Sequence, residues 1–567
     1  MTRRAARPLI VPLLYALLTC AFTFPLVLNL MTHVLGDARL DNYEYVWKLW
    51  WVQHAVFDLG VTPWFNERIY YPFGYPLAYG EMTPIHTFLL MPVTRVLGAV
   101  VTYNLAMIGS TILTGWATYA LARRWLARLI NDIDPRLLSI AAFYAGAAFT
   151  FSASRLLKLT GHLPLVDTHW LVLALLCFDA WLEERRLRLA VLSALMISFS
   201  ALSSWYYALM LGLLLPVYAL ARGGLPSLLR ARRTYAALGV TALITGGLCL
   251  PFLVPYLHVA QEGAATVPLG DAAFWAASPT DYLMPNAFHP LWGEAARRVM
   301  WHFPSPMITE FVIPIGWVTL LFGTWALRHT RGDRWRALKW TMFVAFVLSL
   351  GPYLHVGRLP LGIPLPVLLL REWLPFADGI RTWGRFSTFV MLGFSLLAAA
   401  GIVLALKDQR RRVLAGTVVV GLMLFGAWRG GMPIIRVEAR PVDSWLAAQP
   451  DPAPIMEYPL NEALSGPGMF YTRYHGKPVV FGYGTYLPLL YRERHPDLLA
   501  FPGDSALDQL ASWGVRYILV THDHLDQEPF TLADIDAQPR LFRVRTLDNV
   551  SVYELSETVT SALAEAP

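Results

Sequence analysis

The chain has 567 residues, of which 56% are hydrophobic and only 15% are charged. Its mean hydropathy of +0.45 excludes an ordinary water-soluble domain and a disordered chain. The formal net charge of +7 could indicate nucleic-acid binding, but the cations form short clusters between apolar runs, as in a polytopic membrane protein. The three cysteines lie inside apolar runs and predict neither a disulfide framework nor a metal site.

The apolar runs predict an α-helical membrane protein with about 11 spans, since each span needs about 20 mainly apolar residues. The predicted spans are 9–30, 102–121, 138–154, 163–181, 189–204, 205–221, 235–256, 309–327, 340–354, 386–406 and 413–428. The first run is too long for a signal peptide and is interpreted as a retained helix. The run 84–99 contains two prolines and a histidine, which predicts a juxtamembrane or re-entrant helix instead of a span.

The basic clusters between spans predict the orientation of the chain. With the run 84–99 left out, all five clusters fall on one side, which is the cytoplasmic side by the positive-inside rule. The clusters are Arg123/Arg124/Arg128, Arg185/Arg186/Arg188, Arg230/Arg232/Arg233, Arg331/Arg334/Arg336/Lys339 and Lys407/Arg410/Arg411/Arg412. We therefore expect a multi-pass protein of a bacterial inner (plasma) membrane, with a cytoplasmic N-terminus and an extracytoplasmic C-terminus.

The composition changes after Gly430, where charges become frequent and long apolar runs stop. This change predicts a membrane domain over 1–430 and a small extracytoplasmic domain over 431–567. Strand-like pieces at 454–458, 479–481 and 517–521, with a helix-like piece at 504–514, indicate α/β character. A hairpin is predicted around 542–546 and 550–555, with its turn at Asp548-Asn549.

The stretch from Leu35 to Trp51 directly follows the first predicted span. It places three carboxylates ahead of an aromatic run; the carboxylates are Asp37, Asp41 and Glu44. In a helix over about 42–59, one face would be apolar, formed by Tyr43, Val46, Trp47 and Trp50. Such a helix would lie in the membrane interface, where Trp and Tyr are favoured. Carboxylates held at the edge of a bilayer in this way point to a membrane enzyme.

The order of these features resembles the GT-C superfamily of membrane glycosyltransferases. The shared pattern is a first helix, an outer loop with an acidic motif and an interfacial helix, many spans and an outer C-terminal domain. Local likenesses are Gly36 to Trp51, Tyr71 to Gly74, Tyr103-Asn104 leading to Ala122–Arg124, and Phe151–Arg155 leading to Gly161-His162. The likeness covers about residues 1–430. The Asp-Glu pair and the Trp-Trp-Asp sequence of some members are absent.

The resemblance implies transfer of a sugar from a polyprenyl-phosphate donor to an extracytoplasmic glycan, lipid or protein, with no nucleic-acid partner. The acceptor then needs a general base, and the leaving phosphate needs positive charge. Asp41 is the preferred base in an inverting displacement, and Glu44 and Asp37 are alternatives. Asp41 or Asn42 would otherwise only cap the following helix. No cofactor is required; some of the superfamily use a divalent cation, but no carboxylate spacing here specifies metal ligands.

Several cations on the predicted outer side are candidates for binding the donor's phosphate. Arg155, Lys158 and His162 lie at an outer membrane edge, where they would either hold the phosphate or anchor helix ends. Arg381 and Arg385 precede the tenth span and suit an anionic headgroup.

Three further residues of the outer loops are substrate-binding candidates. Glu81 would be a second carboxylate or a metal ligand, or a solvated loop charge. Asp281 and His289 lie in a loop rich in proline and tryptophan, which could also be a packed lid.

Two other functions remain open. A transporter or flippase of lipid-linked saccharides would need ionisable residues deep within the spans, and their cores contain almost none. A non-catalytic membrane protein could use the outer domain to bind a partner, because a fold alone does not establish an activity.

Overall fold

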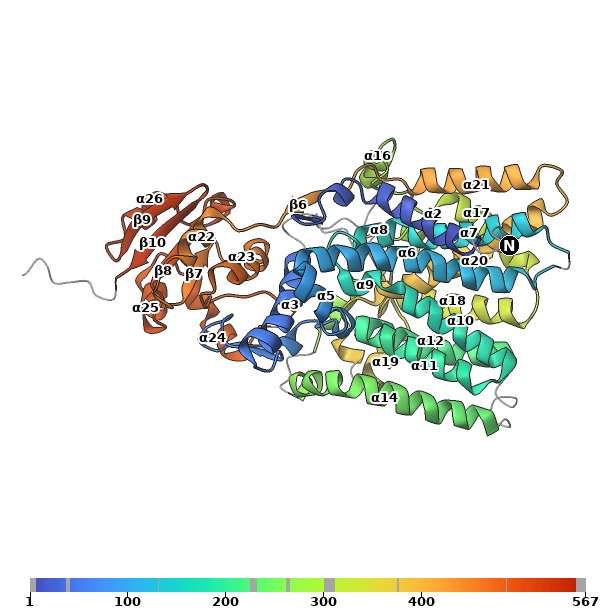
Figure 1. The fold of residues 1–567 in the computed structure, drawn as a ribbon, viewed down its shortest axis with the longest axis horizontal. Coiled ribbons are helices and arrows are strands. Elements are labelled where there is room, and N and C mark those ends of the chain that lie inside the picture. The colour runs from blue at the N-terminus through green and yellow to red at the C-terminus, as the bar shows by residue number, and fades with distance from the viewer. Residues whose placement is uncertain are drawn as a thin grey trace, which may run out of the picture.

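The structure of the protein is a computed structural model, which describes residues 7–36, 41–130, 132–224, 232–261, 266–299, 310, 312–374, 377–485 and 487–556. It is mostly helical, with a helical bundle at one end and a small mixed region of sheet and helix at the other (Figure 1). The predicted α-helical class with a C-terminal α/β region is therefore confirmed.

Each predicted span overlaps one long helix. These helices are α2 (Arg7–Phe22), α6 (Ala99–Leu126), α7 (Pro135–Thr150), α10 (Thr168–Glu184), α11 (Leu187–Ser203), α12 (Trp205–Gly223), α14 (Arg232–Gln261), α17 (Trp317–His329), α18 (Asp333–Ser349), α20 (Ser387–Leu406) and α21 (Arg412–Ala427). Within the described residues, 5 helices are long and apolar enough to cross a membrane, and three more apolar helices are shorter. The fold is that of a polytopic membrane protein.

Two predicted spans begin or end elsewhere than expected. The first was expected to reach residue 30, but α2 ends at Phe22 and the 3-10 turn η1 (Leu26–Leu28) follows. Pro25 lies between them and has no N–H to continue the helical ladder. The span expected from residue 309 begins as α17 at Trp317, after Gly316, whose φ of 85° is incompatible with a helix.

Short elements connect the bundle helices. The run 84–99 forms two short helices, α4 (Pro84–Thr87) and α5 (Met91–Leu97), so it contains no span, as predicted. The other short helices are η3 (Leu77–Tyr79), α8 (Ala153–Lys158), α9 (Leu163–Val166), α15 (Leu269–Phe274), η4 (Asp281–Leu283), α16 (Gly293–Val299), α19 (Val367–Trp373), η5 (Ala377–Gly379) and η6 (Trp383–Phe386). The strands β2 (Phe65–Asn66) and β3 (Tyr75–Pro76) pair with each other, as do β4 (Tyr353–Val356) and β5 (Leu359–Pro364).

The C-terminal region begins with β6 (Ile434–Arg436), which pairs antiparallel with β1 (His33–Leu35) and so joins the two ends of the membrane region. A four-stranded sheet follows in the order β7-β8-β10-β9. Its strands are β7 (Ile455–Tyr458), β8 (Tyr517–Thr521), β9 (Leu541–Leu547) and β10 (Val550–Leu555). The predicted hairpin and two of the predicted strands are confirmed, whereas 479–481 contributes only a single bridge from Val479 to Ile455.

The strands β7 and β8 are parallel, so a crossover must join them. The helices of this region are α22 (Pro441–Ala447), α23 (Glu462–His475), α24 (Leu489–Leu498), α25 (Asp504–Ser512), the 3-10 turn η7 (Leu525–Gln527) and α26 (Leu532–Asp536). Three of these helices, α23 to α25, lie in the crossover. The helix α25 confirms the helix predicted at 504–514.

The predicted interfacial helix is formed by α3 (Asn42–His54), continued by a single π-helical turn η2 (Ala55–Leu59). The helix is buried on more than the one apolar face expected from Tyr43, Val46, Trp47 and Trp50, and its place in the membrane interface stays a prediction. Almost every side chain of α3 is buried, including Lys48 and Val52 on other faces. The reason is a partner from the far end of the sequence: Trp47 Nε1 donates to Thr472 Oγ1 of α23 at 3.0 Å.

The helix α2 packs closely against two glycines of the bundle, Gly115 of α6 and Gly146 of α7, which both lie against Tyr15. A Cβ placed on Gly115 of α6 would overlap the ring of Tyr15, whereas nothing lies within 4 Å of a Cβ on Gly109 of the same helix. The stacking of Tyr15 on Phe143, with ring centroids 4.8 Å apart, fixes the tyrosine ring in place. Close approach of these helices therefore requires glycine at one position of α6 and not at the other.

We expect Gly115→Ala to destabilise the protein by about 1–3 kcal/mol, because overpacking a filled site forces helices apart. Gly109→Ala is the matched control and should be neutral or slightly stabilising, since alanine is the better helix former. Thermal unfolding of the two purified variants in detergent measures the difference. Equal unfolding temperatures would contradict the close packing of α2 on α6.

Candidate functional site

Asp41 occupies the N-cap position of α3 but does not cap it. Its side chain makes no hydrogen bond to the backbone of the helix. Instead, the Tyr483 hydroxyl donates to Asp41 Oδ1 at 2.7 Å. His162 Nε2 lies 3.6 Å from Asp41 Oδ2, and the Asp41 side chain keeps 30% of its surface exposed. The carboxylate is therefore held by its neighbours while one part of it stays accessible.

His162 is the neighbour of Asp41 on the membrane side. Burial lowers the pKa of His162 to about 4, although the charge of Asp41 opposes the shift. The imidazole is thus neutral at physiological pH. Its Nδ1 is buried and has no hydrogen-bond partner among the described residues. A neutral imidazole can accept a proton at the ring nitrogen that carries none.

Lys158 and Arg385 share one carboxylate close to His162. Lys158 Nζ lies 2.7 Å from Glu310 Oε1, and Arg385 Nη2 lies 2.9 Å from the same oxygen. The Arg385 guanidinium also stacks over the ring of Tyr206, 4.2 Å from its centroid. Burial lowers the pKa of Lys158 to about 8 despite the charge of Glu310, while the neighbouring cations hold the pKa of Glu310 below its usual range. Two cations against one carboxylate leave a positive excess beside Asp41.

A second buried pair lies one turn along α3. Glu44 and Lys48 form a salt bridge with almost no exposed surface, and Lys48 Nζ also donates to the Glu81 carbonyl oxygen at 3.0 Å. Burial raises the pKa of Glu44 to about 7, against the opposing charge of Lys48. Burial also raises the pKa of Glu81, with Arg385 and Lys48 acting in the opposite direction. The pKa of Tyr45 is affected by four charged groups, which are therefore close together: Asp41, Glu44, Glu81 and Arg385.

The structure thus brings together six of the predicted site residues. They are Asp41, Glu44, Glu81, Lys158, His162 and Arg385. Asp37 lies outside the described residues.

Arg155 is placed inside the bundle, where its donors are used. It donates to Thr168 Oγ1 at 2.9 Å, to the Thr150 carbonyl at 3.1 Å, to Thr114 Oγ1 at 3.3 Å and to the Val166 carbonyl. Arg381 has an exposed side chain, and its guanidinium lies 5.4 Å from the ring centroid of Trp275. None of these contacts of Arg155 and Arg381 is with Asp41, His162, Lys158, Glu310 or Arg385.

Asp281 and His289 also have local partners. Asp281 accepts the Ser278 backbone N–H at 2.7 Å, and burial raises its pKa to about 7. The His289 ring stacks on Trp292 with centroids 3.3 Å apart, and its Nε2 lies 3.1 Å from the Phe425 carbonyl oxygen. These contacts are typical of a packed loop.

Sequence reasoning missed two members of the site, Glu310 and Tyr483. Glu310 lies at the edge of a run that hydropathy assigned to a span, so it was taken as part of that run. Tyr483 belongs to a short segment of the C-terminal region that packs on the loop after α3. A Cβ on Gly482 would overlap Tyr70, and one on Gly484 would overlap Tyr75. The pair of glycines around one tyrosine was the available signal for a close approach.

A buried polar cluster around Asp167 was also missed. Asp167 lies directly before α10, and its Oδ2 is 3.0 Å from His86 Nε2 and accepts from Ser203 Oγ at 2.9 Å. Ser110 donates to the other carboxylate oxygen. The cluster joins α4, α6, α10 and α11 beneath the site, because each of these elements supplies one partner.

Two of the carboxylates around Asp41 are already engaged by cations. Glu44 is paired with Lys48, and Glu310 with Lys158 and Arg385. No group of three His, Cys, Asp or Glu side chains with suitable geometry occurs in the part of the chain that the structure describes. The divalent cation stays a prediction, and we assign no step to it.

The fold is similar to that of three solved structures of membrane enzymes. One is AglB, the oligosaccharyltransferase of Archaeoglobus fulgidus, in complex with an inhibitory peptide and a dolichol-phosphate. It superposes with a TM-score of 0.53 and 12% sequence identity, and the match covers 92% of this chain and 70% of AglB. The Archaeoglobus fulgidus oligosaccharyltransferase in complex with Zn and sulfate gives 0.55 at 13% identity, over 91% and 68% of the two chains. ArnT from Cupriavidus metallidurans bound to undecaprenyl phosphate gives 0.54 at 14% identity, over 98% and 99%.

These neighbours are membrane glycosyltransferases of the GT-C superfamily. The predicted resemblance in fold is confirmed, since the chain has the GT-C fold over almost its whole length. No family profile and no curated protein matches the sequence.

The buried Glu44 predicts a pH dependence of stability. A glutamate ordinarily titrates near 4.5, and burial raises this pKa to about 7 in the folded protein. Between these values the folded state holds a proton that the unfolded state has lost, so this carboxyl opposes folding increasingly as the pH rises from 4.5 to 7. The effect is on the order of 3 kcal/mol, since one pKa unit corresponds to about 1.4 kcal/mol.

We therefore expect Glu44→Gln to gain stability relative to the wild type as the pH rises from 5 to 8, measured as thermal unfolding in detergent. Glu294→Gln is the matched control, because Glu294 forms the same i,i+4 pair with Arg298 on an exposed surface. The difference in unfolding temperature between Glu294→Gln and the wild type should stay constant from pH 5 to pH 8. A Glu44→Gln difference that is equally constant would contradict the raised pKa.

Proposed function

We propose that the protein is a membrane glycosyltransferase that moves a sugar from a polyprenyl-phosphate donor to an extracytoplasmic acceptor. The observation that supports this proposal is the setting of Asp41. Its carboxylate makes no cap bond, keeps an accessible part, and lies between Tyr483 and His162 with the Lys158–Glu310–Arg385 cluster beyond. A carboxylate next to excess positive charge is the pairing that displacement of a phosphate requires.

The proposed reaction is a single inverting displacement. The acceptor's hydroxyl or amine attacks the anomeric carbon, and Asp41 takes its proton. The bond from that carbon to the donor's phosphate oxygen breaks, and its electron pair goes to the oxygen. Lys158 and Arg385 stabilise the charge that develops on the phosphate, since cations fixed in a water-poor site act more strongly than in solution.

The remaining residues of the site position these groups. Tyr483 orients the Asp41 carboxylate through its hydroxyl, which leaves the second oxygen for the acceptor. Glu310 holds both cations in place through contacts to one of its carboxylate oxygens. Glu44 is less suited to act as the base, because its carboxylate is buried against Lys48.

The fold of the neighbours adds support for the donor class. AglB was solved with dolichol-phosphate and ArnT with undecaprenyl phosphate, and both have the fold seen here. The face that carries Asp41 lies at the end of the bundle opposite the predicted cytoplasmic clusters. We therefore place the reaction on the extracytoplasmic face.

The experiment that tests the proposal compares the wild type with Asp41→Asn. We expect transfer to polymeric or lipid acceptors to fall by about 10²–10⁴-fold, the usual contribution of a general base. Because Asp41→Asn cannot complete the transfer, it should retain its bound donor during purification. Mass spectrometry of co-purifying lipids should then show more polyprenyl-phosphate sugar on Asp41→Asn than on the wild type. Asp58→Asn is the control, since Asp58 is an exposed carboxylate of the same loop paired with Arg95.

Full cell-envelope glycosylation with Asp41→Asn as the only copy would contradict the role of Asp41. Unchanged envelope glycans after deletion of the whole gene would instead favour a non-catalytic protein.

Tyr483→Phe tests the positioning role. Loss of a hydrogen bond to a charged group should lower kcat by about tenfold, while KM for the donor stays the same, because the Tyr483 hydroxyl donates to the proposed base. Tyr458→Phe loses a comparable hydrogen bond, from its hydroxyl to the Leu498 carbonyl at 2.9 Å, away from Asp41. It should keep kcat. A rise in KM with unchanged kcat in Tyr483→Phe would contradict positioning of the base.

A further inference from the structure

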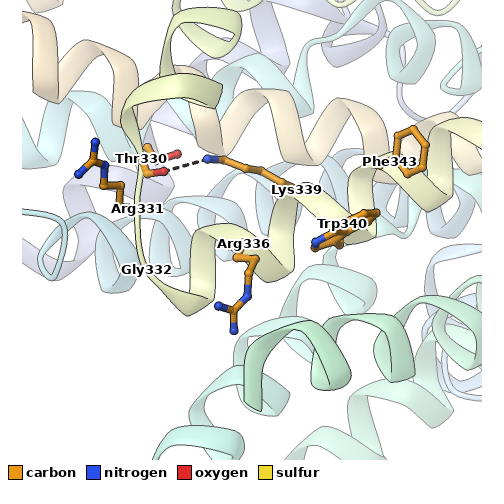
Figure 2. Close-up of a pocket in the computed structure, with 7 residues that line it drawn as sticks. All are labelled: Thr330, Arg331, Gly332, Arg336, Lys339, Trp340 and Phe343. Carbon is orange, nitrogen blue, oxygen red and sulfur yellow. Dashed lines mark hydrogen bonds between the residues drawn. The ribbon is translucent and has the colours of Figure 1, made fainter. Parts of the chain in front are cut away.

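A cavity lies at the end of the bundle opposite Asp41, at the turn between α17 and α18. It has a volume of about 440 Å³, and its lining residues are Thr330, Arg331, Gly332, Arg336, Lys339, Trp340 and Phe343. Figure 2 shows the three cations arranged around Gly332, with Trp340 and Phe343 further along α18. Gly332 has a φ of 97°, so the chain turns sharply here and exposes its backbone to the cavity.

Several cations of the basic clusters at this end of the bundle are neutralised by carboxylates. Arg124 pairs with Glu183 at 2.8 Å, Arg334 with Asp179 at 3.0 Å, and Arg412 with Asp134 at 2.8 Å. These pairs belong to the basic clusters that the sequence placed on one side of the membrane. Their charge is used within the protein, so they offer little to a ligand.

Two of the three cations of the cavity have no carboxylate partner among the described residues. Arg336 pairs with Asp333 at 3.1 Å. Lys339 uses one of its three donors on the Thr330 carbonyl at 2.8 Å, and it has no carboxylate partner among the described residues. The side chain of Arg331 forms no hydrogen bond or ion pair within the described part of the chain. The cavity therefore carries two positive charges that no carboxylate balances.

The apolar side of the cavity indicates which kind of anion would balance these charges. Trp340 is 53% exposed and Phe343 is 54% exposed, and both lie on α18 towards the middle of the bundle. An exposed tryptophan close to cations at a helix end is typical of the boundary between headgroups and acyl chains. A soluble anion would gain nothing from these rings, whereas a lipid would cover them with its chains while its headgroup met the cations.

We propose that this cavity binds the headgroup of an anionic phospholipid from the leaflet at this end of the bundle. The phosphate contacts Arg331 and Lys339, the exposed backbone at Gly332 lies beside it, and the acyl chains cover Trp340 and Phe343. The site is separate from the proposed reaction and lies at the other membrane face. Its occupant would tie α17 to α18 at the turn that joins them.

The test uses the full-length protein in nanodiscs that contain phosphatidylglycerol and phosphatidylcholine, followed by extraction and native mass spectrometry. The wild type should retain phosphatidylglycerol in preference to phosphatidylcholine. Arg331→Gln with Lys339→Gln should weaken this retention by about tenfold or more, because each cation near an anionic lipid contributes a comparable attraction. The control is Arg410→Gln with Arg411→Gln, which removes the same charge from the exposed turn before α21 and should keep the retention.

Three outcomes would overturn the proposal. They are equal losses in the two double variants, equal retention of both lipids by the wild type, and displacement of phosphatidylglycerol by millimolar inorganic phosphate, which would indicate a site for a free anion. A photoactivatable phosphatidylglycerol gives a measurement on the wild type that does not depend on the folding of any variant. It should crosslink to the peptide 330–343, and crosslinks confined to other peptides would also refute the site.

Discussion

The candidate site depends on the burial of α3 between the membrane helices and the C-terminal region. A helix that carries Glu44 and Lys48 inside the protein must satisfy both charges, since an unpaired buried charge costs several kcal/mol. The two side chains pair with each other, and Lys48 also reaches the loop at Glu81. The other side of the helix is covered by α23, where the Tyr43 ring meets Phe470 at 5.1 Å. Without this cover, Asp41 would sit at a solvated helix end.

The arrangement of charge around Asp41 follows from this burial. Four carboxylates and three cations gather in a small volume, and burial raises the pKa of Glu44 and of Glu81 while Glu310 stays strongly acidic. Glu310 remains charged because Lys158 and Arg385 both contact it. The environment of each carboxylate therefore sets its role. Glu44 and Glu310 pair with cations and hold them in place. Asp41 has no cation in direct contact among the described residues, and part of its side chain is exposed.

The sequence predicted the parts of this structure that depend on local pattern. Hydropathy located the long helices, because a span must be apolar along its whole length, and the clustered prolines correctly removed the run 84–99 from the spans. Alternation and turn residues located the hairpin of β9 and β10. The burial of α3 could not be predicted, since the covering helix α23 is distant in the sequence and only tertiary structure brings it there.

The same limit applied to individual site residues. Arg155 and Lys158 lie on one short helix and have the same type of side chain, so their sequence gave them the same predicted role. The fold turns Arg155 towards four acceptors inside the bundle and Lys158 towards Glu310. The residue types made both side chains candidates for binding phosphate. Which of the two reaches the site depends on how α8 is rotated about its axis, and this cannot be read from the sequence.

The bundle is held at both ends by polar contacts, and this explains how a mostly apolar scaffold keeps a precise site. At the far end, the fully buried Asp179 of α10 accepts from Trp125 of α6 at 3.0 Å and from Tyr218 of α12 at 2.8 Å, and pairs with Arg334 of α18 at 3.0 Å. One carboxylate thus fixes four helices relative to each other. At the near end, β1 pairs with β6, and Asp167 joins the helices beneath Asp41. Apolar packing between these ends has no directional preference, so the registration of helices along the bundle comes from the polar contacts at its two ends.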